Sequence, residues 1–236
     1  MIFQSVDWTR IIIVFISQAF IIVLFFILAF KILKRKRNRS TITLSAFYIL
    51  MAIGLMFNIL FIIITPLGNK NILFIIYILA SYLILFSFIF IVMFINIILK
   101  LEEIFTIKKI IGIIVIYGVL CSLLYFLPGG ISFTLNWIPI YSLPLFIIIS
   151  IFFTCFITVP TVHYSIRLYR VFKARNLKER LRLYLFGITL MMIVFYGGIY
   201  FITTSNELFK MLWSVFAFVT EIVAGLLVYY GLGRNL

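Results

Sequence analysis

Acidic residues and metal-binding side chains are scarce in this sequence. The 236 residues include only 6 acidic residues, 1 histidine and 2 cysteines. Zinc and haem are held by several imidazole or thiolate ligands, so neither group is predicted here. Cys121 and Cys155 both fall inside apolar segments, where a thiol behaves as a small hydrophobe. We therefore predict no metal site and no cofactor.

Catalytic sequence motifs are also missing. The chain contains no GxSxG nucleophile motif, no HExxH zinc motif and no GxxxxGK[ST] phosphate loop. Every lysine lies in a loop or near the end of an apolar segment, so none is placed to carry a retinal Schiff base. The interpretation is that the protein is not an enzyme.

Charged residues are few overall, and apolar residues are abundant. The sequence is 66% hydrophobic and 11% charged, whereas soluble domains are roughly 45–50% apolar and about 25% charged. This composition predicts an integral protein of the cell membrane whose main partner is the lipid bilayer. The net charge of +14 does not indicate nucleic-acid binding, because the basic residues collect in short loops instead of covering one polar face.

Seven apolar runs are long enough to cross a bilayer, which takes about 20 residues. A signal peptide is not predicted for the first run, because its basic cluster follows the apolar residues. The fold class is therefore all-α, a polytopic seven-transmembrane helix bundle forming a single domain over residues 1–236. The spans are expected at residues 11–30, 41–64, 72–99, 110–127, 144–166, 184–202 and 208–232.

The basic residues alternate between the loops in a way that predicts orientation. With seven spans, the loops on one side hold only Arg10, Lys70 and Lys210. All the other lysines and arginines fall on the opposite side, and positive charge beside apolar helices stays cytoplasmic. We predict that the N-terminus lies outside and the C-terminus lies in the cytoplasm.

The most basic stretch, RLYRVFKARNLKERLR at residues 167–182, lies between the fifth and sixth apolar runs. We call it the basic strap. Anionic lipid headgroups at the cytoplasmic face attract such a segment, and a cytoplasmic signalling protein is the other candidate partner. The side chains expected to make these contacts are Arg167, Arg170, Lys173, Arg175, Lys178, Arg180 and Arg182.

Two further stretches depart from simple helices. The segment from Ile131 to Pro144 is apolar and aromatic but holds two prolines, so it predicts an interfacial loop or lid with Trp137 and Tyr141 at headgroup level. Pro160 lies inside the fifth run, where it is expected to kink the helix and free a carbonyl.

Glu221 is the one acidic residue deep inside a span. A charged acid at the bilayer centre costs on the order of 2.5 to 3.5 kcal/mol, so such residues face the bundle interior and often mark function. One interpretation is a neutral acid hydrogen-bonded to a neighbouring helix. The other is a contact for a ligand, proton or cation. Other polar residues in the spans, such as Gln18 and Asn58, are expected to join helices by hydrogen bonds.

The layout resembles the seven-helix sensory regions at the N-terminus of some membrane histidine kinases. The resemblance rests on the basic first inner loop, the fifth helix running into the basic strap, and the final LVYYGLGRNL. It implies a sensor, and because no kinase domain precedes Leu236, it implies either a stand-alone sensor or a membrane partner that signals through another protein. The topology is also similar to that of G-protein-coupled receptors, although their aspartate-arginine-tyrosine and asparagine-proline motifs are absent.

Three functions stay open. The leading hypothesis is a receptor- or sensor-like protein that accepts a small apolar ligand in its outer half and contacts a cytoplasmic partner through the basic strap. The alternative is a small secondary transporter that uses Glu221. A non-catalytic subunit of a membrane complex fits the absence of motifs equally well.

Overall fold

The computed structural model describes residues 8–35, 37–99, 107–134 and 138–233. Within these ranges, seven helical stretches are long and apolar enough to cross a membrane, which confirms the predicted seven apolar helices. The elements are α1 (Trp8–Arg35), α2 (Arg39–Ile64), a short η1 (Thr65–Leu67), α3 (Lys70–Ser87), α4 (Ile89–Ile98), α5 (Ile107–Tyr125), β1 (Ile131–Phe133), β2 (Pro139–Tyr141), α6 (Leu143–Phe153), η3 (Thr154–Thr158), α7 (Val159–Val171), α8 (Arg175–Thr203) and α9 (Glu207–Gly231).

Short polar turns begin several of these helices. The side chain of Asn38 accepts a hydrogen bond from the backbone N–H of Thr41, and the Thr41 hydroxyl accepts one from the N–H of Asn38 in return. Asn69 and Asn206 cap α3 and α9 in the same first-turn manner. Because the first N–H groups of a helix have no partner within the helix, these caps satisfy donors that the apolar runs leave open.

Two of the seven spans are built from more than one helix. The third span is interrupted at Phe88, which separates α3 from α4. The fifth span passes through η3, one turn of π-helix, immediately before Pro160 in α7. Proline has no N–H to donate and its ring crowds the preceding turn. The kink predicted at Pro160 therefore takes the form of a widened turn on its N-terminal side.

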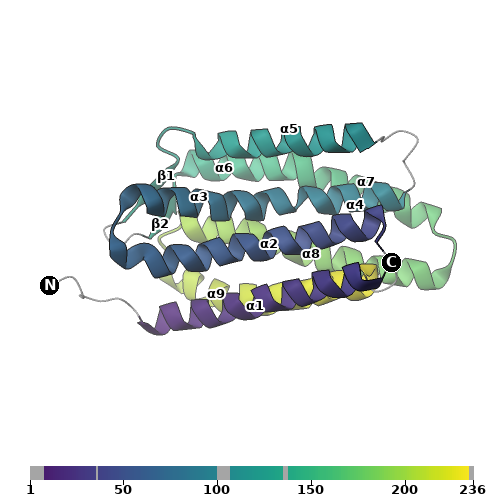
Figure 1. The fold of residues 1–236 in the computed structure, drawn as a ribbon, viewed down its shortest axis with the longest axis horizontal. Coiled ribbons are helices and arrows are strands. Elements are labelled where there is room, and N and C mark those ends of the chain that lie inside the picture. Colours follow the sequence, from purple (N-terminus) through teal and green to yellow (C-terminus); the bar gives the residue numbers. More distant parts are fainter. Residues whose placement is uncertain (1–7, 36, 100–106, 135–137, 234–236) are drawn as a thin grey trace.

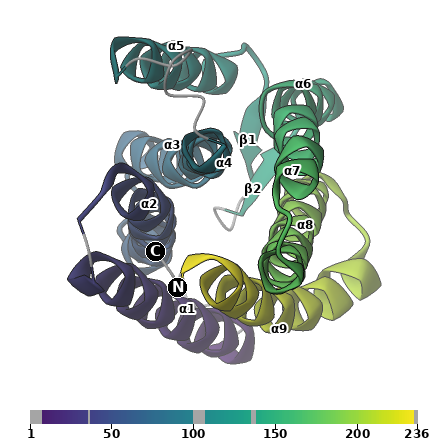
Figure 2. The ribbon, with the colours of Figure 1, turned by 90° about the vertical axis from the view of Figure 1, so that its right-hand side faces the viewer.

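The helices form a ring with α5 outside it. Viewed from one end, α1, α2, α3 with α4, α6 with α7, α8 and α9 follow one another around the bundle, while α5 lies on the outer side of α3 (Figure 2). Helix α1 begins at the end of the bundle that carries β1 and β2, and α9 finishes at the opposite end (Figure 1). We call these the hairpin end and the basic end.

The basic residues follow the same division. Lys70 and Lys210 stand at the starts of α3 and α9, at the hairpin end. The end of α1, the starts of α2 and α5, and the connection between α7 and α8 lie at the basic end (Figure 1). The basic strap is mostly helical, because α7 continues to Val171 and α8 begins at Arg175. Both helices therefore extend beyond the predicted spans, which ended at residue 166 and began at residue 184, and the strap consists of the end of α7, a short link and the start of α8.

The segment expected as a loop or lid is an antiparallel hairpin. Ile131 pairs with Tyr141 and Phe133 with Pro139. Trp137 lies outside the described residues. The side chain of Tyr141 is buried in the bundle instead of facing outward, and its hydroxyl donates a hydrogen bond to Ser81 Oγ at 3.3 Å. Phe133 packs against Phe61 and Tyr77, so the hairpin presents aromatic rings to the bundle interior.

Glycine allows α8 and α9 to pack closely. A Cβ atom added to Gly187 would come within 2.9 Å of the carbonyl oxygen of Ala224, and one added to Gly231 would come within 2.6 Å of the backbone nitrogen of Tyr184. Only glycine permits such backbone proximity without displacement. Many large apolar side chains on the outer helix faces are exposed, as expected for residues that meet lipid.

Candidate functional site

Glu221 lies near the middle of α9, about 21 Å along the helix axis from Glu207 at roughly 1.5 Å per residue. Its side chain lines a cavity of about 220 Å³ inside the bundle. Residues from α2, α3, α5, α6, α8, α9 and β2 contribute to the wall. The cavity therefore draws together most of the bundle, including the hairpin.

The carboxyl group of Glu221 has no partner in the described part of the chain. Within the described residues, none donates a hydrogen bond to it and no lysine or arginine forms an ion pair with it. The structure therefore supplies no bond of the kind that the first interpretation, an acid held by a neighbouring helix, requires. Desolvating a carboxyl group without a partner is unfavourable in either protonation state.

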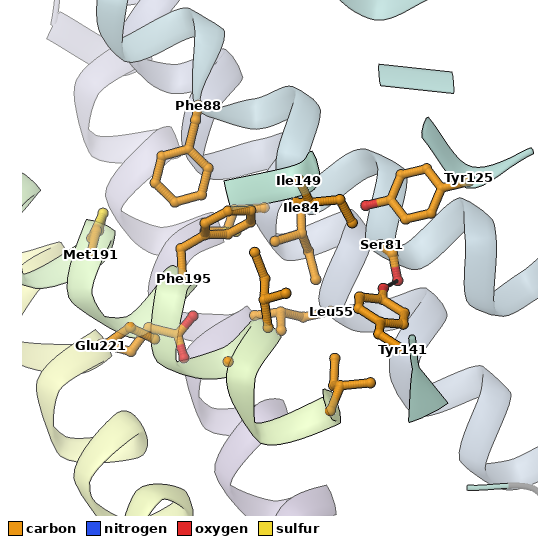
Figure 3. A pocket seen from close by; sticks show the side chains of 15 residues that line it. Leu55, Ser81, Ile84, Phe88, Tyr125, Tyr141, Ile149, Met191, Phe195 and Glu221 are labelled. Carbon is orange, nitrogen blue, oxygen red and sulfur yellow. Dashed lines mark hydrogen bonds between the residues drawn. The ribbon is translucent and has the colours of Figure 1, made fainter. Parts of the chain in front are cut away.

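A second polar group lies on the other side of the cavity from Glu221 (Figure 3). It consists of Ser81 from α3, Tyr125 from the end of α5 and Tyr141 from β2. The Tyr141 hydroxyl donates to Ser81, as described above. Burial raises the pKa of the Tyr141 phenol above its ordinary value, so this group is a neutral hydroxyl at physiological pH.

The wall between these two polar groups is apolar. Leu55, Ile84, Ile149 and Phe195 lie between Glu221 and Tyr141 in the close-up view (Figure 3). Gly198 also lines the cavity, and a Cβ atom added there would meet nothing within 4 Å. The arrangement is an apolar chamber with a carboxyl group at one side and hydroxyl groups at the other, a combination typical of small-molecule sites.

Two hydrogen bonds join the π-helical turn to α8 beside this chamber. The hydroxyl of Tyr196 lies 2.6 Å from Thr154 Oγ1 and 3.0 Å from Thr158 Oγ1. The ring of the preceding residue, Phe195, stacks on Phe153 with centroids 4.0 Å apart. These contacts hold the widened turn of the fifth span against the helix that supplies Phe195 and Gly198 to the cavity.

The other polar residues singled out from the sequence play mostly structural parts. Asn58 Nδ2 donates to Gln18 Oε1 at 3.2 Å, which confirms the prediction that these two residues join helices. His163 lies on an exposed face of α7, with its ring 5.4 Å from that of Tyr164. No group of three or more histidine, cysteine, aspartate or glutamate side chains gathers within the described ranges in a way that could hold a metal.

The side chains of the basic strap do not form one cluster. Arg175 pairs with Glu179 at 3.1 Å on an exposed helix face. Lys178 and Arg182 instead surround the ring of Tyr169, where Arg182 Nη2 donates to the tyrosine hydroxyl at 2.6 Å. Arg170 lines a groove between α7 and α8. The seven predicted strap residues thus divide among different environments, with Arg167 and Lys173 exposed and Arg180 half-buried.

Sequence reasoning missed Ser81, Tyr125 and Tyr141 as neighbours of Glu221. All three come from elements far apart along the chain, and each alone is an ordinary residue of an apolar segment. The one signal available was the two prolines that mark Ile131 to Pro144 as a departure from helix. Only the packing of the hairpin into the bundle shows that Tyr141 points inward.

Seven helices of this length and hydropathy define the protein as a multi-pass membrane protein. Comparison with models of known protein families finds no match, and comparisons with curated proteins and with solved structures find none either.

Proposed function

We propose that this protein is a receptor- or sensor-like protein of the cell membrane that binds a small, largely apolar ligand in the cavity beside Glu221. The observation that supports this most directly is the unpartnered carboxyl group facing an apolar chamber with hydroxyl groups across it. A ligand with an apolar body and one polar group would satisfy both features. The role is non-catalytic.

The proposed orientation places the hairpin end outside and the basic end in the cytoplasm. Lys70 and Lys210 are the basic residues at the starts of α3 and α9, whereas the strap lies at the other end. This division is what the positive-inside rule expects of that orientation. A ligand would then reach the cavity from the outer half, and the strap would contact a cytoplasmic partner.

The carboxyl group of Glu221 favours a ligand with a basic nitrogen. A buried carboxylate is stabilised when a cation approaches it and donates hydrogen bonds. Among the described residues, no lysine or arginine lines this cavity. A protonated amine on a short hydrocarbon body would supply the missing charge while its chain fills the apolar wall.

Three probes of equal chain length test this proposal on the purified full chain. We expect n-heptylamine to raise the melting temperature more than heptan-1-ol, and heptanoate to have the smallest effect, because a ligand that binds only the folded state stabilises it. The Glu221→Gln variant should respond equally to the amine and the alcohol. Glu207→Gln is the matched control, since Glu207 is exposed and pairs with Lys210 outside the cavity. An amine preference that survives in Glu221→Gln would contradict the proposed site.

Orientation is tested separately from binding. Asn69→Cys and Asn176→Cys place thiols at the hairpin end and in the basic strap, respectively. In intact cells, a membrane-impermeant maleimide should label the first and spare the second until the membrane is opened. Labelling of Asn176→Cys alone in intact cells would reverse the proposed orientation and leave the binding experiment untouched.

The secondary transporter is the second candidate, because a carboxyl group without a partner in a span is also what a proton- or ion-coupled carrier uses. Uptake of n-heptylamine into liposomes driven by a proton gradient, lost in Glu221→Gln, would favour the transporter. Binding without such uptake would favour the receptor.

A further inference from the structure

The groove between α7 and α8 opens where these helices diverge. Along its length α7 approaches α4 more closely than it approaches α8, which leaves a space of about 280 Å³ near the basic end. Toward the short link between Val171 and Arg175, the two helices are joined through Tyr169 of α7, whose hydroxyl accepts a hydrogen bond from Arg182 Nη2 of α8 at 2.6 Å. The walls are mainly apolar and comprise Val162, Ile166, Leu185, Ile188 and Met192.

Cations gather around the end of this groove nearest the link. Arg170 lines the groove itself. Next to it, Lys178 Nζ and Arg182 Cζ lie 5.1 Å and 5.5 Å from the centroid of the Tyr169 ring. Among the described residues neither Arg170, Lys178 nor Arg182 forms an ion pair, since the nearby Glu179 is paired with Arg175. The mouth of the groove therefore holds positive charge that the described chain does not neutralise.

Two hydroxyl groups form part of the groove wall below these cations. Thr161 and Ser165 are 2% and 3% exposed, and within the described structure neither hydroxyl has a hydrogen-bond partner. Buried polar groups are nearly always paired, so each unpaired hydroxyl calls for a missing partner. By contrast, the Thr189 hydroxyl in the same groove donates to the carbonyl of Leu185 at 2.9 Å.

The order of groups along α7 matches one class of molecule. Ser165 lies about 7.5 Å and Thr161 about 13.5 Å along the helix from Arg170, at roughly 1.5 Å per residue. Passing inward, the groove thus offers a cation first and then, along one stretch of wall, hydroxyl donors next to apolar side chains such as Ile166 and Val162. A glycerophospholipid presents its phosphate first, followed by its ester carbonyls and the adjoining part of its acyl chains.

We propose that the groove binds one anionic glycerophospholipid of the leaflet at the basic end, with its phosphate against Arg170 and Arg182 and its ester carbonyls accepting hydrogen bonds from Ser165 and Thr161. The inference goes beyond ligand binding beside Glu221 and uses different residues. It rests on the proposed function only in taking the helices to be membrane-embedded. Which leaflet supplies the lipid follows from the orientation test, whereas binding itself is measured in detergent.

Native mass spectrometry of the detergent-solubilised full chain tests the site. Phosphatidylglycerol and phosphatidylcholine with identical oleoyl chains are titrated in parallel. We expect one phosphatidylglycerol to bind in preference to phosphatidylcholine. The Arg170→Gln variant should bind phosphatidylglycerol about fivefold more weakly, the factor that corresponds to roughly 1 kcal/mol for one basic residue near an anionic headgroup.

Arg167→Gln is the matched control, because Arg167 is an exposed strap arginine outside the groove. Equal weakening by both arginine variants would overturn the proposal, since it would show diffuse attraction and no defined site. Equal binding of the two lipids would also overturn it. Stabilisation by glycerol 3-phosphate as strong as that by phosphatidylglycerol would identify a free phosphate ligand and overturn the lipid assignment.

The hydroxyl groups are tested by the Thr161→Val and Ser165→Ala double variant. Thr203→Val is the control, because Thr203 lies on α8 outside the groove and its hydroxyl donates to the carbonyl of Ile199 at 2.9 Å. The double variant should melt at or above the wild-type temperature without lipid, because two unpaired buried hydroxyls are removed. Its affinity for phosphatidylglycerol should nevertheless fall, while Thr203→Val leaves that affinity unchanged. A double variant that binds phosphatidylglycerol like the wild type would overturn the placement of the ester groups.

Discussion

Helix α8 is closed on one side and open on the other. Toward α9, glycines at 187 and 231 let the two backbones approach so closely that no side chain fits between them. Toward α7, bulky apolar side chains and unpaired hydroxyls line a groove. The difference shows how residue size shapes the two sides of one helix. Glycines let the backbones of α8 and α9 touch, whereas larger side chains between α7 and α8 hold the helices apart and leave a groove.

The strongest test of this contrast uses one substitution at two positions of α8. Gly187→Ala should destabilise the fold by about 1–3 kcal/mol, because the added Cβ overpacks against the backbone of α9. Gly198→Ala faces the cavity, where the Cβ meets nothing within 4 Å. It should stabilise the protein by up to about 1 kcal/mol through helix propensity. Thermal unfolding in detergent measures both, and equal effects at the two positions would refute the close packing of α8 against α9.

The second largest loss of stability is expected when the contact between α8 and the π-helical turn is weakened. Tyr196→Phe removes the hydroxyl that lies within hydrogen-bonding distance of Thr154 and Thr158. Hydrogen bonds between membrane helices are worth about 0.6 kcal/mol each, so we expect a loss of roughly 1 kcal/mol. Tyr200→Phe serves as control, since Tyr200 is an exposed tyrosine one helical turn away. No difference between the two variants would show that the turn is held by packing alone.

A tyrosine that joins α2 to α9 should have a smaller effect. The Tyr48 hydroxyl donates to the carbonyl of Gly225 at 2.8 Å within the core. Tyr48→Phe keeps the ring contacts with Phe25 and Phe47 and loses this single bond. We expect a lower melting temperature equivalent to about 0.6 kcal/mol. An unchanged melting temperature would show that this hydrogen bond contributes nothing to the packing of α2 against α9.

The smallest effect is expected on the basic strap. Arg175 and Glu179 form an ion pair in which the side chains are 94% and 57% exposed. Exposed pairs of this kind contribute little, so Arg175→Gln should change the free energy of unfolding by less than about 0.5 kcal/mol. Chemical unfolding at low and high salt gives the measurement. A large, salt-sensitive loss would mean that the strap is a structural element of the fold.

Much of the architecture could be predicted because the preference of an apolar segment for the bilayer depends on that segment alone. A run such as 41–64 is apolar enough to prefer the bilayer whatever surrounds it, and the basic residues between runs indicate which ends face the same way. Pro160 likewise disturbs its own helix through its missing N–H. The break at Phe88 could not be predicted, because the sequence around Ser87 to Ile89 contains no proline or glycine and is typical of a continuous helix.

Only part of the candidate site could be predicted from the sequence. Glu221 stood out because an acid in an apolar run is costly wherever that run lies. Tyr141 was placed at headgroup level because an aromatic residue beside prolines is typical of an interface, and the hairpin turned it inward. Thr161 and Ser165 were ordinary polar residues of a span until α7 and α8 were seen to diverge around them.

The sequence alone determined that the chain has seven helices apolar enough to cross a membrane, where its basic residues collect, and which acidic residue lies inside an apolar helix. Those properties depend on transferring one segment at a time from water to lipid. The tertiary structure decided that Glu221 borders a chamber shared with the hairpin, and that α8 is sealed against α9 but open toward α7. Such features depend on which helix faces meet, because packing is set by the shapes of side chains that lie far apart in the sequence.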